Sequence, residues 1–171
     1  NEKILIFLFI ILIYLTTIVI TIWNILYSNN FDNKLQLYLI ISVCVFTDIG
    51  GYIFGKIFGG KKLTKISPNK TYSGMVGGFL LSIICINFYA YYTNNYLDTS
   101  AEFNIEAFIM VILISSISQF GDIIISYFKR LSKIKDTGKI IPGHGGILDR
   151  IDGMIFAIPF TYLMLISGIF E

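Results

Sequence analysis

The chain has 171 residues, of which 55% are hydrophobic and 14% are charged. Soluble domains carry about 25% charged residues, so this composition, with a mean hydropathy of +0.74, excludes a soluble enzyme and predicts an integral membrane protein. The net charge of +2 does not indicate a nucleic acid as partner. Cys44 and Cys85 lie inside apolar runs without the spacing of a zinc site, and we expect no structural disulfide.

Five apolar runs are long enough to cross a hydrocarbon core about 30 Å thick. They cover residues 4–26, 35–58, 74–92, 105–128 and 151–170. This pattern predicts an all-α polytopic membrane protein with about five transmembrane helices, which form a single domain over residues 1–171. Because the chain begins with Asn1 and not Met, we expect that residues are missing upstream.

The charges between the apolar runs predict an orientation. Residues 60–73 and 129–150 form two basic loops, whereas residues 93–104 include Asp98 and Glu102 and contain no Lys or Arg. Cytoplasmic loops of membrane proteins carry an excess of Lys and Arg. We therefore predict that both basic loops and the N-terminus face the cytoplasm, and that the C-terminus lies outside.

Two carboxylates interrupt the apolar runs. Asp48 and Asp122 lie within or at the ends of these runs, where a carboxylate is costly unless it is paired, bound to a metal or facing water. Both are therefore candidates for a functional site. The alternative is structural, with either carboxylate paired to a neighbouring Lys or to polar backbone.

Residues 121–153 combine a helix end, a basic loop, a glycine-rich turn and further carboxylates. If residues 122–130 are helical, one helix face carries an acid, a hydroxyl group and two cations: Asp122, Ser126, Lys129 and Arg130. Asp149 and Asp152 are three residues apart at the start of the last helix and share one face there. The two helix ends can meet, and their carboxylate oxygens, with waters and phosphate oxygens, suit Mg²⁺.

The glycine-rich turn is a candidate phosphate site. His144 has glycine on both sides and follows Pro142, so that backbone N–H groups can approach a phosphate closely. Five cations surround the turn in the sequence: Lys129, Arg130, Lys135, Lys139 and Arg150. For each cation singly, the positive flank of a membrane helix is the simpler interpretation, and His144 could equally be a structural turn residue. The sequence contains no P-loop or HExxH motif.

Residues 126–152 resemble the signature of the phosphatidate cytidylyltransferases, or CDP-diglyceride synthases. The matching positions are Ser126, Lys129, Arg130, Lys135, Asp136, Gly138, Pro142, Gly143, His144, Gly145, Gly146, Asp149, Arg150 and Asp152. An upstream block also resembles the family, at Asp48, Gly51, Tyr52, Gly55, Lys56, Gly59, Ser67, Pro68, Lys70, Thr71 and Gly74. Two departures are Ser73, where the family usually has Glu, and the absence of further N-terminal spans. We expect residues 36–171 to be the catalytic core of the family.

The resemblance implies transfer of a cytidylyl group from CTP to phosphatidate in a bacterial cytoplasmic (inner) membrane, giving CDP-diacylglycerol and pyrophosphate. It implies Mg²⁺ held by Asp122 and Asp149, and it allows a second cation such as K⁺. The other residues expected to act in catalysis are Lys129, Arg130 and Asp152. Those expected to contact substrate are Asp48, Lys70, Thr71, Ser126, Lys135, Asp136, His144, Gly145, Gly146 and Arg150. The family likeness also suggests a homodimer.

Two structural expectations follow. Because phosphatidate keeps its acyl chains in the bilayer, the site must open sideways, through polar residues at the ends of the second and fourth spans. Glycines on the second and third spans are predicted to let helices approach closely within or between subunits: Gly55, Gly59, Gly74, Gly77 and Gly78.

Several other functions remain open. A CDP-alcohol phosphotransferase would also use membrane carboxylates, but its DGxxAR signature is not present. A small cation transporter or a subunit that packs against a partner would not need the dense loop of residues 129–150. A truncated, inactive fragment of the synthase is the closest rival.

Overall fold

The computed structural model describes residues 2–27, 31–64, 67–96, 104–134, 137–138, 146 and 148–167, without the side chains of residues 2–12, 31–33, 148 and 150. Five α-helices make up most of this described part: α1 (Glu2–Tyr27), α2 (Phe31–Phe58), α3 (Tyr72–Tyr96), α4 (Ile105–Leu131) and α5 (Leu148–Ile166). Each helix coincides with one of the five apolar runs, so the all-α prediction is confirmed. Residues 168–170 of the fifth run, and the acidic residues Asp98 and Glu102, lie outside the described part.

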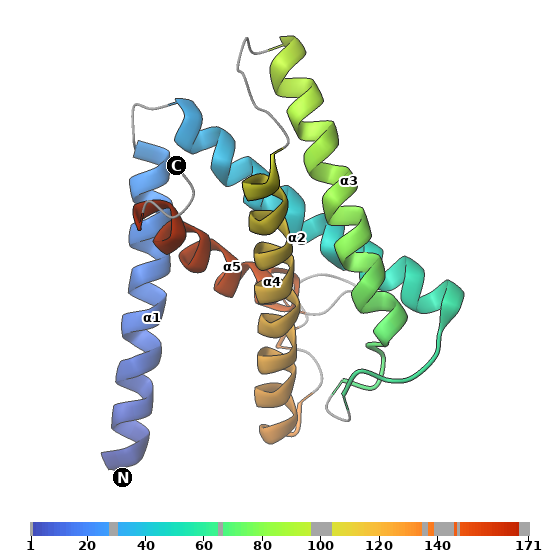
Figure 1. Ribbon diagram of the computed structural model, residues 1–171. Coiled ribbons are helices and arrows are strands. Elements are labelled where there is room, and N and C mark those ends of the chain that lie inside the picture. Colours follow the sequence, from blue (N-terminus) through green and yellow to red (C-terminus); the bar gives the residue numbers. More distant parts are fainter. Residues whose placement is uncertain are drawn as a thin grey trace.

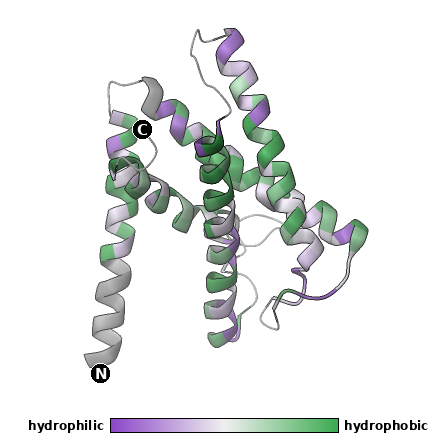
Figure 2. Cartoon of the chain, in the orientation of Figure 1, coloured by the Kyte–Doolittle hydropathy of each residue, from purple (hydrophilic) through white to green (hydrophobic). Residues whose placement is uncertain are grey.

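The helices have the length and the surface of membrane spans. Lys34–Phe58, Tyr72–Tyr96 and Ile105–Leu131 are long and apolar enough to cross a membrane, and Ile13–Tyr27 and Ile151–Ile166 are shorter apolar helices. Figure 2 shows hydrophobic residues over the middle of the helices and hydrophilic residues toward their ends. Large apolar side chains also cover the outside of the bundle, as they do where a protein faces lipid. The chain is an integral membrane protein.

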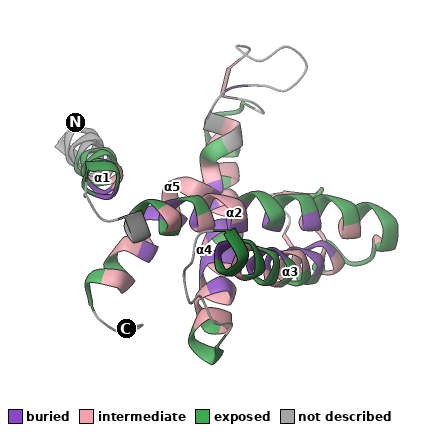
Figure 3. Cartoon of the chain, turned by 90° about the horizontal axis from the view of Figure 1, so that it is seen from above, coloured by how far each residue is buried: buried purple, intermediate pink, exposed green. Residues whose placement is uncertain are grey.

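The core lies where the oblique helices cross the upright ones. In Figure 1, α1, α3 and α4 stand roughly upright, and α2 and α5 cross them obliquely. The core residues come from four helices: Ile40, Val43, Cys44, Ile86, Val111, Ile114, Ala157 and Ile158. Figure 3, viewed from above, shows buried residues gathered at this centre and exposed residues on the outer faces. The core therefore fixes α4 and α5 against α2.

α2 and α3 approach each other through glycines. A Cβ atom on Gly50 would lie 2.3 Å from the carbonyl oxygen of Gly77, and a Cβ atom on Gly74 would lie 2.6 Å from that of Gly51. A Cβ atom on Gly78 would lie 3.0 Å from the backbone of α2. The predicted close approach at Gly74, Gly77 and Gly78 is therefore confirmed, and the contact is between two helices of one chain.

α1 is attached to α5 at a proline. Pro159 lies inside α5, so it has no N–H to donate to the carbonyl oxygen of Ile155, four residues earlier. The hydroxyl group of Tyr14, on α1, donates to this carbonyl oxygen at 2.9 Å. Neighbouring helices commonly satisfy backbone groups that a proline frees inside a membrane. The α1–α5 contact thus supplies the hydrogen bond that Pro159 removes.

Replacing Tyr14 with Phe should lower the free energy of unfolding by about 1 kcal/mol, because the carbonyl oxygen of Ile155 would lose its donor. The effect can be measured by unfolding in mixed micelles with increasing SDS. The control is the same change in a Pro159→Ala background, where the introduced alanine can donate its own backbone N–H and the loss should shrink. An equal loss in both backgrounds would contradict this role of Tyr14.

Candidate active site

A short hairpin between α2 and α3 begins where a glycine ends α2. Gly59 has a φ of +57°, a conformation that favours glycine at a helix end, and its N–H donates to the carbonyl oxygen of Gly55 at 3.1 Å. Lys62 and Thr71 then form an antiparallel bridge. Among the described residues, no atom beyond its chain neighbours lies within 4 Å of a Cβ atom built on Gly59. Within the chain, the predicted close helix approach is therefore not found at Gly59, where glycine instead serves the backbone conformation. A contact of Gly59 between subunits stays a prediction. At Gly55, the Cβ atom would meet the hydroxyl oxygen of Thr71 at 3.1 Å.

The tip of the hairpin orients Lys70. The N–H of Lys70 donates to the carbonyl oxygen of Ser67 at 3.1 Å, which closes a four-residue turn with Pro68 at its second position, where proline is favoured. The hydroxyl group of Ser73 donates to the carbonyl oxygen of Gly59, which joins the start of α3 to the end of α2. Ser73 is the position at which the sequence departs from the family pattern, and here it has a structural contact.

A cavity of about 320 Å³ lies beneath the hairpin. It is lined by residues from α2, the hairpin, α3, α4 and the first turns of α5. Seven of the predicted site residues are among them: Asp48, Lys70, Thr71, Asp122, Ser126, Asp149 and Asp152. The two sequence blocks that carry the family resemblance therefore meet in one cavity.

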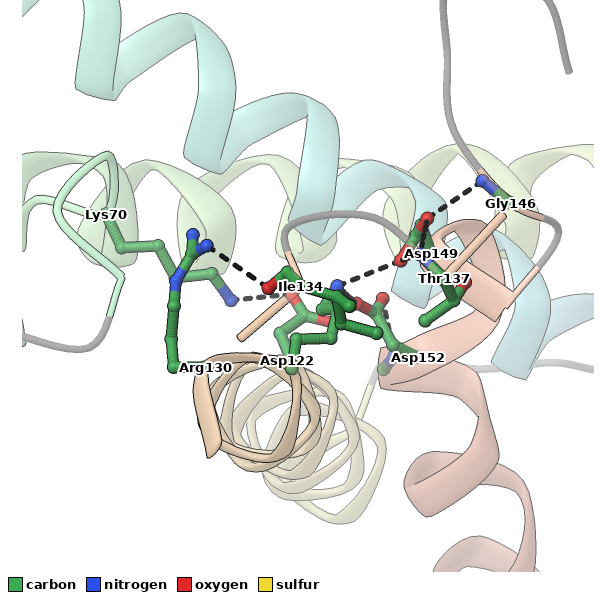
Figure 4. A network of polar contacts seen from close by, with 10 residues as sticks. Lys70, Asp122, Arg130, Ile134, Thr137, Gly146, Asp149 and Asp152 are labelled. Carbon is green, nitrogen blue, oxygen red and sulfur yellow. Dashed lines mark hydrogen bonds and ion pairs between the residues drawn. The ribbon is translucent and has the colours of Figure 1, made fainter. Parts of the chain in front are cut away.

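Two lysines pair with the carboxylates of this cavity (Figure 4). The ammonium group of Lys70 lies 2.7 Å from Oδ2 of Asp122. The ammonium group of Lys129 lies 3.0 Å from Oδ1 of Asp149 and 3.6 Å from Oδ2 of Asp152. Because Lys129 is on α4 and both of its partners are on α5, the predicted meeting of these two helix ends is confirmed.

Asp149 is held by several donors. Its Oδ2 accepts hydrogen bonds from the N–H of Thr137 at 2.9 Å and from the N–H of Gly146 at 2.8 Å. Burial would raise the pKa of Asp149, but these two N–H groups and the Lys129 ammonium group lower it to about 2. Its place in the first turn of α5 also favours negative charge. Asp149 is therefore ionised at neutral pH, and it fixes the loop before α5 to the cavity.

One carboxylate oxygen of Asp122 has no hydrogen-bond partner in the described part of the chain. Its Oδ1 is buried and accepts no hydrogen bond from the described residues, while a Cβ atom on Gly153 would lie 2.9 Å from it. The glycine thus lets α5 pass close to this carboxylate. Four carboxylates line the cavity, those of Asp48, Asp122, Asp149 and Asp152. The last three are within ion-pair distance of the ammonium groups of Lys70 or Lys129.

This donor set fits a hard cation such as Mg²⁺, which prefers carboxylate oxygens. The carboxylates offer more oxygen atoms than the two lysines engage. The Oδ1 of Asp122, which has no hydrogen-bond partner among the described residues, is available as a ligand. In the described residues, no three Asp, Glu, His or Cys side chains are already grouped as a metal site. A cation held by two or more of these carboxylates would compete with the ammonium groups of Lys70 and Lys129 for the same oxygen atoms.

The other predicted residues have different positions. Arg130 is exposed, and its Nη1 donates to the carbonyl oxygen of Ile134 at 3.5 Å, away from the residues that line the cavity. Gly146 is buried, and its N–H holds Asp149. Lys135, Asp136, His144 and Gly145 lie outside the described residues, as does the side chain of Arg150. The phosphate-binding turn around His144 thus stays a prediction.

Several polar residues of the cavity were not expected from the sequence. Thr47, Asn69 and Gln119 line it, and the hydroxyl group of Thr47 donates to Oγ of Ser115 at 2.9 Å. Gln119 lies one helical turn before Asp122 on α4, and Thr47 directly precedes Asp48. The spacing of Gln119 to Asp122 is a signal that could have identified it, because residues three apart share a helix face.

Both basic loops lie at the same end of the bundle. Lys70 and Asn69 of the first loop line the same cavity as Asp149, which lies near the end of the second. The N–H of Thr137, in that second loop, binds Asp149. This agrees with the prediction that both loops are on one side of the membrane. That this side is the cytoplasm stays a prediction.

The fold and the cavity together define a polytopic α-helical membrane protein with a charged cavity at the ends of its helices. The sequence profile of the Cytidylyltransferase family matches residues 1–167. The chain belongs to this family.

Curated relatives are named phosphatidate cytidylyltransferase. The protein of Staphylococcus aureus (strain COL) is 40% identical over 126 residues, which cover 71% of this chain and 45% of the relative. The protein of Staphylococcus saprophyticus is 42% identical over 125 residues, with 71% and 45% covered. The protein of Haemophilus influenzae is 38% identical over 137 residues, with 78% and 47% covered. The chain spans about half the length of the curated relatives it matches.

Proposed function

We propose that this chain transfers a cytidylyl group from CTP to phosphatidate, forming CDP-diacylglycerol and pyrophosphate. The observation that carries the proposal is the meeting of Lys70 and Asp122 with Lys129, Asp149 and Asp152 around one cavity at the ends of membrane helices. The names of the relatives support the choice of substrates. A substrate with one end in the bilayer and one phosphate at its surface suits a cavity in this position.

In the reaction, a phosphate oxygen of phosphatidate forms a bond to the α-phosphorus of CTP, and the bond from that phosphorus to the pyrophosphate oxygen breaks. A phosphate monoester has a second pKa of about 6, so it is largely dianionic at pH 7 and needs no strong general base. The main task of the protein is to offset negative charge and to align the two phosphates. Lys70 and Lys129 are the described cations placed to do this.

The carboxylates are proposed to hold Mg²⁺. Asp122 and Asp149 are its principal ligands in this proposal, Asp152 is the next, and a second, monovalent cation such as K⁺ is bound beside them. When bound, Mg²⁺ would offset charge on the α-phosphate and on the leaving pyrophosphate. Asp149 is already ionised and fixed by two backbone N–H groups, so it can serve as a rigid ligand once Lys129 moves to substrate.

The remaining parts of the proposal concern the setting of the enzyme. The basic loops face the cytoplasm of a bacterial inner membrane, the cavity receives CTP from that side, and the chain forms a homodimer. Arg130 and Arg150, with the turn around His144, complete the phosphate contacts.

The proposal is tested by measuring pyrophosphate release from the purified chain in detergent with CTP, phosphatidate and Mg²⁺. Release should require all three, and diacylglycerol should not replace phosphatidate, because it lacks the attacking phosphate. An ion conductor would instead give a cation flux in liposomes that does not depend on CTP. Such a flux without pyrophosphate release would contradict the proposal.

A further inference from the structure

One face of α2 connects the cavity to the outside of the bundle. Asp48 and Tyr52 both line the cavity and are one helical turn apart, so they share a face of α2. Both residues are exposed, and the exposed fraction of Tyr52 is 67%. The neighbouring exposed residues on α2 include apolar ones, Ile49 and Ile53. The cavity wall is thus continuous with an outer surface that has the composition of a lipid-facing surface.

A lysine stands at the end of this face. Lys56 is one further turn along α2, and its ammonium group lies 3.4 Å from the hydroxyl oxygen of Tyr52 and 5.6 Å from the centroid of the Tyr52 ring. Lys56 is exposed, and within the described part of the chain it forms no ion pair. The ammonium groups of Lys70 and Lys129, by contrast, each form an ion pair with a carboxylate.

We infer that Lys56, oriented by Tyr52, binds the phosphate monoester of the lipid substrate before it enters the cavity. The inference rests on the proposed function for the identity of that lipid. A phosphate monoester carries about −1.5 to −2 charges at pH 7, more than the single charge of a phosphodiester lipid, so an unpaired cation at the bilayer surface selects for it. The acyl chains would lie along the apolar surface of α2 while the phosphate passes from Lys56 past Tyr52 to Lys70.

A purely structural role for Lys56 makes a different prediction. Lys56 is in the last turn of α2, where a cation interacts favourably with the helix dipole, and its stem can extend along apolar surface toward water. In that case its removal would change stability and would not change the affinity for one lipid relative to another.

The test is binding of short-chain phosphatidate to the purified chain in detergent, measured by calorimetry, with short-chain phosphatidylglycerol and inorganic phosphate as comparison probes. Lys56→Gln should weaken phosphatidate binding about fivefold and change phosphatidylglycerol binding less than twofold. Inorganic phosphate, which has a similar charge but no acyl chains, should bind the unaltered chain more weakly than phosphatidate does. Lys56→Arg, which keeps the charge, should retain affinity. Lys61→Gln removes an exposed lysine that does not line the cavity and should have no effect.

Unchanged phosphatidate affinity in Lys56→Gln, or an equal loss in Lys61→Gln, would overturn the inference. So would a wild-type chain that does not bind phosphatidate. Cytidylyl transfer is measured in parallel on the same samples. If binding depends on Lys56 but no transfer occurs, the proposed function fails and the phosphate site stands. If transfer occurs and neither phosphatidate affinity nor the lipid KM changes in Lys56→Gln, only this inference fails.

Discussion

Replacing Asp122 with Asn is expected to lower the rate of cytidylyl transfer by about 100-fold or more. The amide keeps the size of the side chain but removes the charge that pairs with Lys70 at 2.7 Å. It also replaces the carboxylate proposed to bind the metal through its buried Oδ1 with a neutral amide, which is a weaker ligand. Loss of several kcal/mol of charge stabilisation corresponds to at least two powers of ten in rate. The measurement is kcat from pyrophosphate release with both substrates saturating.

The matched control for Asp122→Asn is Glu106→Gln. Glu106 is an exposed carboxylate in the first turn of the same helix, α4, and it does not line the cavity. Its replacement should change kcat by less than about threefold, because exposed charges contribute little. Full activity in Asp122→Asn, or similar losses in both variants, would contradict the proposed site.

Replacing Gly50 with Ala is expected to lower the free energy of unfolding by about 1–3 kcal/mol. The added Cβ atom would lie 2.3 Å from the carbonyl oxygen of Gly77, and because that oxygen belongs to the backbone of α3, the clash can be relieved only by separating α2 from α3. The hairpin that carries Lys70 joins these two helices, so their separation should also displace the residues that line the cavity.

Gly51→Ala is the control for this prediction. Beyond the backbone of α2 itself, the nearest described atom to a Cβ atom on Gly51 is the carbonyl oxygen of Gly74, at 3.8 Å. This is an ordinary contact, and Ala is favoured over Gly inside a helix by up to about 1 kcal/mol. Gly50→Ala should therefore lower the free energy of unfolding, whereas the adjacent Gly51→Ala should raise it or leave it unchanged. Unfolding in mixed micelles with increasing SDS measures both, and equal effects would show that the close contact of Gly50 with α3 does not limit the packing of the two helices.

The helices could be predicted from the sequence because membrane spans leave a strong pattern. All five apolar runs became helices, with ends within a few residues of the expected ones. The shared face of Asp122, Ser126 and Lys129 could also be predicted, because residues on one helix have fixed relative directions. Arg130 shows the limit of this reasoning. Its long side chain was predicted on the same face, but it donates to the carbonyl oxygen of Ile134 and does not line the cavity.

Contacts between distant segments could not be predicted. The pair of Lys70 and Asp122 depends on a hairpin bridge between α2 and α3, and no periodicity within either segment indicates it. For the hydrogen bond from Tyr14 to Ile155, only the acceptor could be predicted, because Pro159 leaves the carbonyl group four residues earlier without its helical donor. The sequence does not show which helix supplies the donor.

The central claim is that the cavity transfers a cytidylyl group and not a terminal phosphate. The most direct test supplies the purified chain with phosphatidate, Mg²⁺ and CTP that is radiolabelled either at the α-phosphorus or at the γ-phosphorus, and then measures the label in the extracted lipid. The account predicts that the α-label enters the lipid and that the γ-label is released as pyrophosphate. Label from the γ-position in the lipid, or none from the α-position, would contradict it.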